Sequence, residues 1–245
     1  MKSTRLIMGM PITVEVLNAE SFAILNKVFA YFTYIDNKFS TYKEDSEISR
    51  LNRGEISPDG ATSDMRTILR LSEHTKKETG GYFDISFRGK LDPAGLVKGW
   101  AILQAAMILD EAGVENYYIE AGGDIQVKGK NAAGENWRIG IRNPFKLRQI
   151  VKVLSVSDLG IATSGTYERG RHIYNPKTSR MAEDDIVSLS VVGPNIYEAD
   201  RFATAAFAMG RQGIYFLEKQ PNLEGYMIDK KGIATMTSGF GRYVK

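Results

Sequence analysis

The chain has 245 residues, of which 43% are hydrophobic and 25% are charged, a mixture typical of globular proteins with a real core. No stretch approaches the roughly 18 consecutive apolar residues that a membrane-spanning helix needs. The net charge is only +3, and Lys and Arg are interspersed with Asp and Glu, so we do not expect nucleic acid as the main partner. Without cysteine, and with only two histidines, a metal would be held by oxygen, which favours magnesium or a similar hard cation.

The first half of the chain is predicted to be mainly helical. Residues 11–17 alternate in the manner of a strand, and residues 18–39 place apolar side chains at helical spacing, giving one apolar face. Ser63 can cap a second helix, which the glycines at 80 and 81 would stop. A third helix is predicted from Leu96 to Ala112, ending at Gly113.

The second half changes character, and most of its segments are predicted to be strands. These predicted strands are Tyr117–Glu120, Ile125–Lys128, Trp137–Ile141, Val151–Ser157 and Ile186–Val192. A fourth helix is predicted from Glu198 to Met209, and a final hairpin around residues 225–232. We find no repeat and no flexible linker, so we expect one domain spanning residues 1–245, with a mixed α/β fold whose halves share one cleft.

Five short signatures combine small residues at a bend or helix start with one carboxylate, hydroxyl or amine. In chain order they are Asp92–Gly99, Glu120–Asp124, Ala162–Gly165, His172–Pro176 and Ala199–Thr204. Such sites let backbone amides and a hard cation approach a phosphate closely. Five of them in one chain predict an enzyme that handles a diphosphate.

Asp200 and Thr204 are the first candidate metal ligands. They stand four residues apart near the start of an Ala-rich helix, so their side chains lie on one face a turn apart. Each can give one oxygen to a cation. The alternative is structural: Asp200 caps the helix and Thr204 bonds back to a carbonyl.

The first and second signatures supply further candidates. Gly95 follows a proline turn and can point its carbonyl oxygen at a metal, while Lys98, in the first turn of the predicted helix, can reach a phosphate as a point charge. The alternative is a proline turn with a solvated lysine. Gly122, Gly123 and Asp124 join two predicted strands, which also suits an ordinary tight hairpin turn.

The third and fourth signatures carry hydroxyls and a histidine. Thr163, Ser164 and Gly165 follow a strand-like segment and can hold a phosphate, although no Walker loop, Rossmann fingerprint or nucleophile elbow surrounds them. His172 can accept a proton from an attacking hydroxyl, or it can simply hold its loop by a hydrogen bond.

Together these motifs resemble the ApbE family, the FAD:protein FMN transferases. The likeness runs from Met8-Gly9 to about Gly210 and so covers most of the chain. Besides the five signatures, it rests on the segments Phe39–Tyr42, Ser46–Asn52, Gly81–Ile85 and Thr163–Arg169. The chain departs from the common family pattern at Met10, Leu103, Asn175, Ser179 and Ala203.

The resemblance implies an ApbE-like, T-fold-like architecture of two interlocked lobes with the ligand cleft between them. It implies binding of FAD, use of Mg²⁺ at the diphosphate, and transfer of FMN to the threonine hydroxyl of an acceptor protein with release of AMP. The implied metal ligands are Asp200, Thr204 and the backbone oxygen of Gly95. The implied contacts to FAD are Met8, Tyr42, Tyr82, Phe83, Asp84, Asp92, Lys98, Asp124, Thr163, Ser164, Gly165 and Tyr174. His172 is assigned as the base.

Two other functions fit the same residues. Water in place of threonine would make the protein an FAD pyrophosphatase that yields FMN and AMP, and loss of catalysis would leave an FAD-binding carrier. The first residues show neither a signal peptide pattern nor a cysteine for lipidation, so we expect a cytoplasmic protein.

Overall fold

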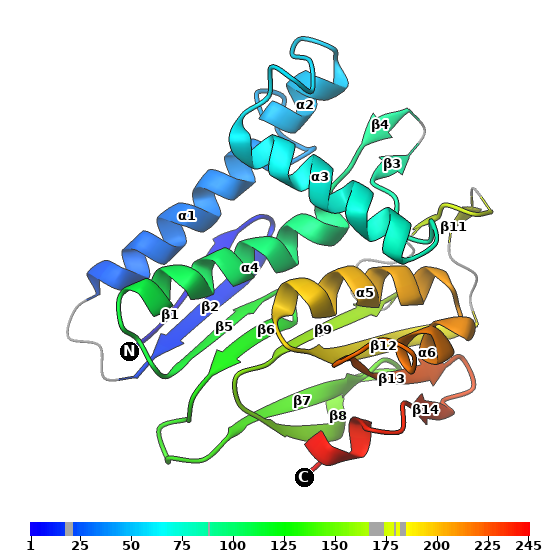
Figure 1. Cartoon of the computed structure of the whole chain (residues 1–245). Coiled ribbons are helices and arrows are strands. Elements are labelled where there is room, and N and C mark those ends of the chain that lie inside the picture. The colour runs from blue at the N-terminus through cyan, green and yellow to red at the C-terminus, as the bar shows by residue number, and fades with distance from the viewer. Residues whose placement is uncertain (18–21, 88, 167–173, 179, 182–184) are drawn as a thin grey trace.

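The computed structural model describes residues 1–17, 22–87, 89–166, 174–178, 180–181 and 185–245. An eight-stranded sheet in the order β1-β2-β5-β6-β9-β12-β13-β14 runs through the centre (Figure 1). Its strands are β1 Lys2–Ile7, β2 Met10–Val16, β5 Tyr117–Ala121, β6 Asp124–Lys128, β9 Gly160–Gly165, β12 Ile186–Gly193, β13 Glu224–Asp229 and β14 Ala234–Met236. Every neighbouring pair is antiparallel.

Alternation along the strands gives the sheet two different faces. In β2, Ile12, Val14 and Val16 are fully buried on the face that meets the helices. In β5, Tyr118 and Glu120 point to the opposite face and are only half-buried. The two faces therefore belong to two separate cores.

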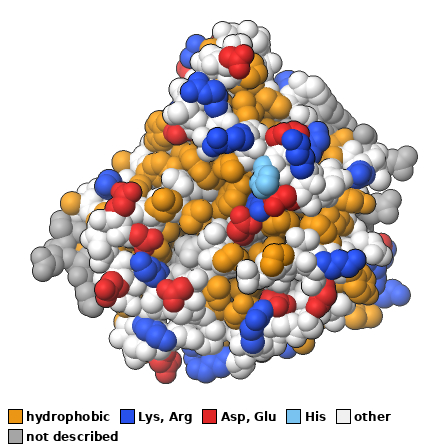
Figure 2. Space-filling view, viewed as in Figure 1, with side chains coloured by type: hydrophobic (Ala, Val, Ile, Leu, Met, Phe, Trp, Pro, Cys, Tyr) orange, Lys and Arg blue, Asp and Glu red, His pale blue; other side chains and the backbone are white. Residues whose placement is uncertain are grey.

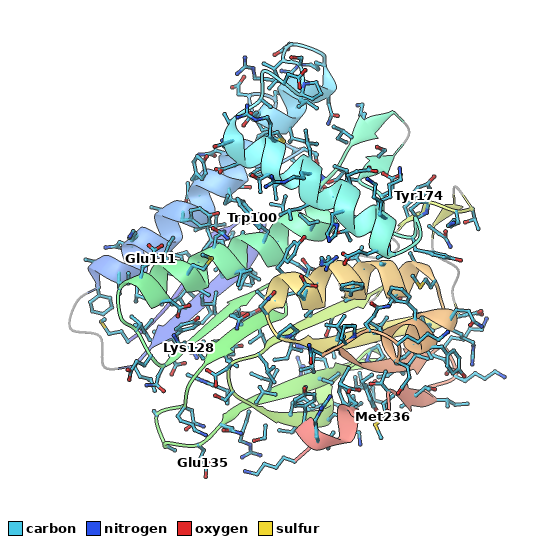
Figure 3. All side chains as sticks on the ribbon, viewed as in Figure 1. Trp100, Glu111, Lys128, Glu135, Tyr174 and Met236 are labelled. Atoms are coloured by element: carbon cyan, nitrogen blue, oxygen red, sulfur yellow. The ribbon has the colours of Figure 1, made fainter. Side chains whose placement is uncertain are left out.

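The helices are α1 Ala23–Phe39, α2 Glu47–Asn52, α3 Ser63–Glu78, α4 Ala94–Glu111, α5 Ile196–Ala208 and α6 Gln212–Leu217. Helices α1, α4, α5 and α6 cover the first face, and α2 and α3 lie beyond them, away from the sheet (Figure 1). Helix α4 has buried apolar residues on all sides, because it packs against α1, α3, α5 and the sheet. Figure 3 shows Trp100 on α4, and its ring lies 6.1 Å from that of Phe39 and 6.5 Å from that of Tyr31 in α1. Figure 2 shows hydrophobic side chains gathered over α1 and α4 on the viewed face.

A hairpin of β7 (Trp137–Asn143) and β8 (Lys146–Val156) forms a second layer on the other face. Its inward side chains, including Ile139 and Leu154, join apolar residues of β6, β9, β12 and β13 in the second core. The 3₁₀ turn η1 (Phe240–Tyr243) and the chain end close the outer edge of β8: Leu154 pairs with Val244, and the N–H of Lys245 donates to the carbonyl of Val153 at 3.1 Å.

Two short strand pairs complete the fold, namely β3 (Ser86–Phe87) with β4 (Lys90–Leu91), and β10 (Tyr174–Asn175) with β11 (Arg180–Met181). The mixed α/β class predicted from the sequence is confirmed. No helix in the described part of the chain has the length and apolar character needed to cross a bilayer.

Two local predictions are wrong. Ser63 does not cap α3 but is its first residue, preceded by Thr62 in extended conformation. Thr163, Ser164 and Gly165 do not form the predicted bend after a strand, because they continue β9 and pair with β12 along Ser188–Ser190. Lateral hydrogen bonds to a strand more than twenty residues away decide their conformation, and a local pattern does not contain that information.

Candidate active site

Helices α4 and α5 approach each other closely at Gly99. A Cβ atom on Gly99 would lie 2.7 Å from the Cβ of Asp200 and 2.9 Å from the carbonyl oxygen of Ile196, so any other residue would push the helices apart. The N–H of Gly99 also donates to Oδ2 of Asp200 at 2.8 Å. This contact fixes the carboxylate of Asp200, which is 4% exposed, against α4.

The ammonium of Lys98 joins two buried carboxylates. Its Nζ lies 2.6 Å from Oδ2 of Asp124 at the start of β6 and 3.8 Å from Oδ1 of Asp200. Asp124 is fully buried, and its Oδ1 accepts from the N–H of Thr163 at 3.1 Å. Three of the predicted signatures therefore meet at one lysine.

When Asp200 is ionised, two carboxylates and one ammonium give the cluster an excess negative charge. Burial raises the pKa of Asp200 to about 8; the neighbouring Asp124 also raises it, whereas Lys98 and the Gly99 N–H act in the opposite direction. An additional cation would relieve this unfavourable charge.

The oxygens of Gly95 and Thr204 lie beside this cluster. Oγ1 of Thr204 stands one helical turn after Asp200 and lies 3.5 Å from the carbonyl oxygen of Gly95, at the outer limit of a hydrogen bond. A Cβ on Gly95 would lie 3.2 Å from Cγ2 of Thr204, so the glycine keeps this space open. In the described part of the chain no three His, Cys, Asp or Glu side chains gather as a metal site, so a cation here would need hydroxyl and carbonyl ligands.

The segment before α4 brings three of the predicted flavin contacts to the same end of the helix. Oδ1 of Asp92 accepts from the N–H of Ala94, the first residue of α4, at 3.1 Å. The ring of Phe83 is buried, 3.5 Å from the position that a Cβ on Gly95 would take. Asp84 is held by an ion pair with Lys76 at 2.7 Å.

The other predicted contacts are less directly connected. Met8, with φ of 56°, and Gly9 form the two-residue turn between β1 and β2. Tyr42 is 97% exposed, and the ring of Tyr82 lies under the ammonium of Lys177. Figure 3 shows Tyr174 near the C-terminal end of α3.

Other predicted site residues fall inside strands or outside the described residues. Ser164 is buried within β9, so its hydroxyl is not on an exposed nucleophile turn. Gly122 and Gly123 form a two-residue hairpin turn, with both φ angles positive. His172 lies outside the described residues, and its role as base stays a prediction.

Two structural contributions were missed in the sequence. The backbone N–H of Gly99 orients Asp200; its signal was a glycine directly after the lysine of the first signature. Arg201 is buried beside Asp200, and its guanidinium pairs with Glu78 of α3 and with Glu198 of α5. The arginine next to Asp200 was visible in the sequence, but its partner in α3 lies 123 residues away.

Comparison with known proteins shows the family of the chain. The model of the ApbE family matches residues 8–91 and 87–227. The chain belongs to the ApbE family. It is a homologue of FAD:protein FMN transferases: that of Haemophilus influenzae is 26% identical over 270 residues, covering 83% of this chain and 78% of the relative, and that of Vibrio cholerae is 25% identical over 252 residues, covering 79% and 75%.

Solved ApbE structures have the same fold. The flavin transferase ApbE from Vibrio cholerae superposes with a TM-score of 0.87 at 24% identity, covering 99% of this chain and 98% of the other. The apo form of Pseudomonas stutzeri flavinyl transferase ApbE gives a TM-score of 0.84 at 19% identity, covering 100% and 97%.

Proposed function

We propose that this protein transfers FMN from FAD to a threonine hydroxyl of an acceptor protein and releases AMP. Family membership supports the reaction class, and the names of the homologues support FAD and a protein as the two substrates. The observation that carries the proposal is the buried Lys98–Asp124–Asp200 cluster beside the Gly95 and Thr204 oxygens.

The donor chemistry of this site fits Mg²⁺. One buried carboxylate (Asp200), one hydroxyl (Thr204) and one backbone carbonyl (Gly95) are hard oxygen ligands, and a bound cation would balance the negative charge that Asp200 carries when it is ionised. When bound, Mg²⁺ would neutralise charge on the diphosphate of FAD. The raised pKa of Asp200 in the metal-free protein is consistent with this assignment, because a cation would favour the charged carboxylate.

The protein's own groups position the reaction. The threonine oxygen forms a bond to the FMN-side phosphorus, the bond from that phosphorus to the AMP oxygen breaks, and AMP leaves with the electron pair. The hydroxyl proton passes to a base, for which we propose His172. Lys98 holds both carboxylates in place and puts a positive charge at the same point, where a phosphate oxygen can meet it. The N-terminal end of α4 adds a favourable dipole for the anion.

We assign the flavin and the adenine nucleotide to the segments that converge on the start of α4. The proposed contacts are those implied by the family: the Met8 turn, Tyr42, Tyr82–Asp84, Asp92 and Tyr174, with Asp124 and Thr163–Gly165 lining the phosphate end. The buried Phe83 beside Gly95 supports this placement, since it links the flavin segment directly to the proposed metal ligands.

The test follows AMP release and covalent flavin together. Purified protein is incubated with FAD, with and without Mg²⁺, and with an acceptor domain that carries a flavinylation-motif threonine. Mg²⁺-dependent AMP and a fluorescent band on the denatured acceptor are expected. AMP with free FMN and no band, for every acceptor tried, would instead indicate the FAD pyrophosphatase, and intact bound FAD in all conditions would indicate a carrier.

A further inference from the structure

The second layer of the molecule stops part-way across the sheet. The β7–β8 hairpin covers the second face over β6, β9, β12 and β13, whereas the second-face side chains of β2 and β5 remain partly open to solvent. A cavity of about 220 Å³ lies at the border between the covered and the uncovered part of this face. It is lined by Tyr118 and Glu120, the Gly122–Gly123 turn, Thr163, and residues 138–142 of β7.

This cavity adjoins the proposed reaction centre. Thr163 lines it, and the N–H of the same residue binds Oδ1 of Asp124, which in turn pairs with Lys98. On another side, Gly123 directly precedes Asp124, and its N–H is held by Oε1 of Glu120 at 2.8 Å. A group in the cavity therefore stands one residue away from the charged cluster, on the face opposite to α4 and α5.

The edge of β7 that borders the cavity carries backbone groups of Gly140 that pair with no strand in the described part of the chain. Val153 of β8 gives its carbonyl to Lys245, so its backbone groups point away from β7. Gly140 is opposite Val153 in the register and must also point its N–H and C=O away from the partner strand. Gly140 is exposed, and in the described part of the chain no strand pairs with this edge.

The hairpin also has a distinctive charge. Residues 137–156 contain five basic residues and no Asp or Glu: Arg138, Arg142, Lys146, Arg148 and Lys152. Three large apolar side chains of the same hairpin are about half exposed, namely Phe145, Leu147 and Ile150. Such a combination of basic and apolar groups favours an acidic protein surface over a small ligand.

We propose that the acceptor protein docks here by adding an extended segment to the free edge of β7. This proposal rests on the proposed function and names the partner's mode of binding. The segment would pair with the outward N–H and C=O of Gly140, extend the second layer over β5, and bring the threonine to the Gly122–Gly123 turn. Acidic side chains around the segment would face the basic hairpin.

Gly140 allows a sharp test, because one variant removes only the edge donor. Gly140→Pro deletes an N–H that does not bond to β8, and proline is tolerated at a strand edge. Gly140→Ala is the matched control: it keeps the N–H and adds the same Cβ, which would lie 2.9 Å from Cδ1 of the exposed Ile150 side chain. We expect Gly140→Pro to lower kcat/KM for the acceptor about 10-fold or more, and Gly140→Ala to stay within about 2-fold.

Two readouts separate this proposal from the proposed function. FAD affinity and Mg²⁺-dependent AMP release without acceptor report on the reaction centre and should be unchanged in both variants. Equal transfer by Gly140→Pro and Gly140→Ala would overturn the docking proposal, and so would a parallel loss of FAD binding in a folded Gly140→Pro protein. Absence of transfer by the wild-type protein would remove the proposed function itself, and the docking mode with it.

Hydrogen exchange on the wild-type protein gives an answer that needs no variant to fold. The acceptor domain, with its target threonine replaced by valine, is added to the enzyme with FAD. The Gly140 amide should exchange at least about 10-fold more slowly in the complex, because it becomes a strand donor. Unchanged exchange at Gly140 under conditions that saturate the complex would exclude β7 pairing.

Discussion

The two faces of the central sheet are built in opposite ways. On the first face, which the helices cover, Gly99 leaves no room for a Cβ beside Asp200 and donates its N–H to that carboxylate, and each charge of the cluster has a partner of opposite charge. On the second face, which the β7–β8 hairpin covers, Gly140 is exposed and the nearby basic side chains lie at the surface. Tight packing with fixed partners suits groups that must position a phosphorus to within a fraction of an ångström. Exposed backbone and charged side chains suit a surface that receives another protein.

The largest effect that we expect is the loss of AMP release in Asp200→Asn, on the first face of the sheet. The variant keeps the shape of the side chain but removes the charge that would hold Mg²⁺, so Mg²⁺-dependent AMP release should fall about 10³-fold or more. Its metal-free thermal stability at pH 8 should not fall, because a buried carboxylate with a raised pKa has been neutralised. Asp110→Asn, which removes a surface partner of Lys128, is the control and should retain activity. Retention of full turnover in Asp200→Asn would refute the metal assignment.

Gly99→Ala should have the next largest effect, on stability. The new methyl would lie 2.7 Å from the Cβ of Asp200, and separation of α4 from α5 should lower the free energy of unfolding by about 2 kcal/mol. Gly241→Ala meets nothing within 4 Å and should change the same quantity little. Urea unfolding of both variants measures the difference. Equal midpoints would show that the two helices are not locked together at this point.

The pH dependence of metal binding should change by a smaller factor. A carboxyl with a folded pKa of about 8 holds a proton that the unfolded chain has released, so metal-free stability should fall as the pH rises from about 4 to about 8. Mg²⁺ competes with that proton, and its affinity should rise about 10-fold per pH unit within this window and level off above pH 8. Calorimetric titration at pH 6, 7 and 8 tests the slope. An affinity independent of pH would exclude Asp200 as a protonated ligand.

The smallest expected effect is on the second face. Arg148→Glu should reduce the rate of FMN transfer to an acidic acceptor about 3-fold at low salt, with little effect at high salt, because exposed charges act mainly on association. Lys27→Glu makes the same charge change on exposed α1 and should have less effect. Initial rates of FMN transfer, measured at two salt concentrations, distinguish the variants. Identical losses for both would indicate a general charge effect and no local docking surface.

The sequence predicted the helices, and the placement of Asp200 and Thr204 on one helix, for physical reasons that are local. Helical periodicity marks α1 and α5, and the spacing of Asp200 and Thr204 places both on one helix face whatever surrounds them. The start of α5 shows the limit of this reasoning: its cap is Asn195, whose side chain accepts from the N–H of Glu198, and not Asp200. Asp200 is thereby left available for the site.

The partners in the site could not be predicted, because they come from long-range packing. Nothing near Lys98 in the chain indicates that it pairs with Asp124, and Asp124 itself stood in a motif that also suited a plain hairpin. The burial that raises the pKa of Asp200 depends on the whole α4–α5 contact. The outward direction of the Gly140 backbone groups is visible only once the register with β8 and the contact of Val153 with Lys245 are known.

The strand pairing at the C-terminal end has a practical consequence for handling the protein. Val244 and Lys245 occupy the outer edge of β8, so among the described residues the edge of β7 is left without a partner strand and the edge of β8 is covered. Deleting these last residues, or displacing them with a fused tag, would uncover a second edge on the same basic, partly apolar hairpin. With both edges exposed, hairpins of neighbouring molecules would pair edge to edge and form chains of molecules. A tag fused after Lys245 is therefore expected to promote aggregation at high protein concentration.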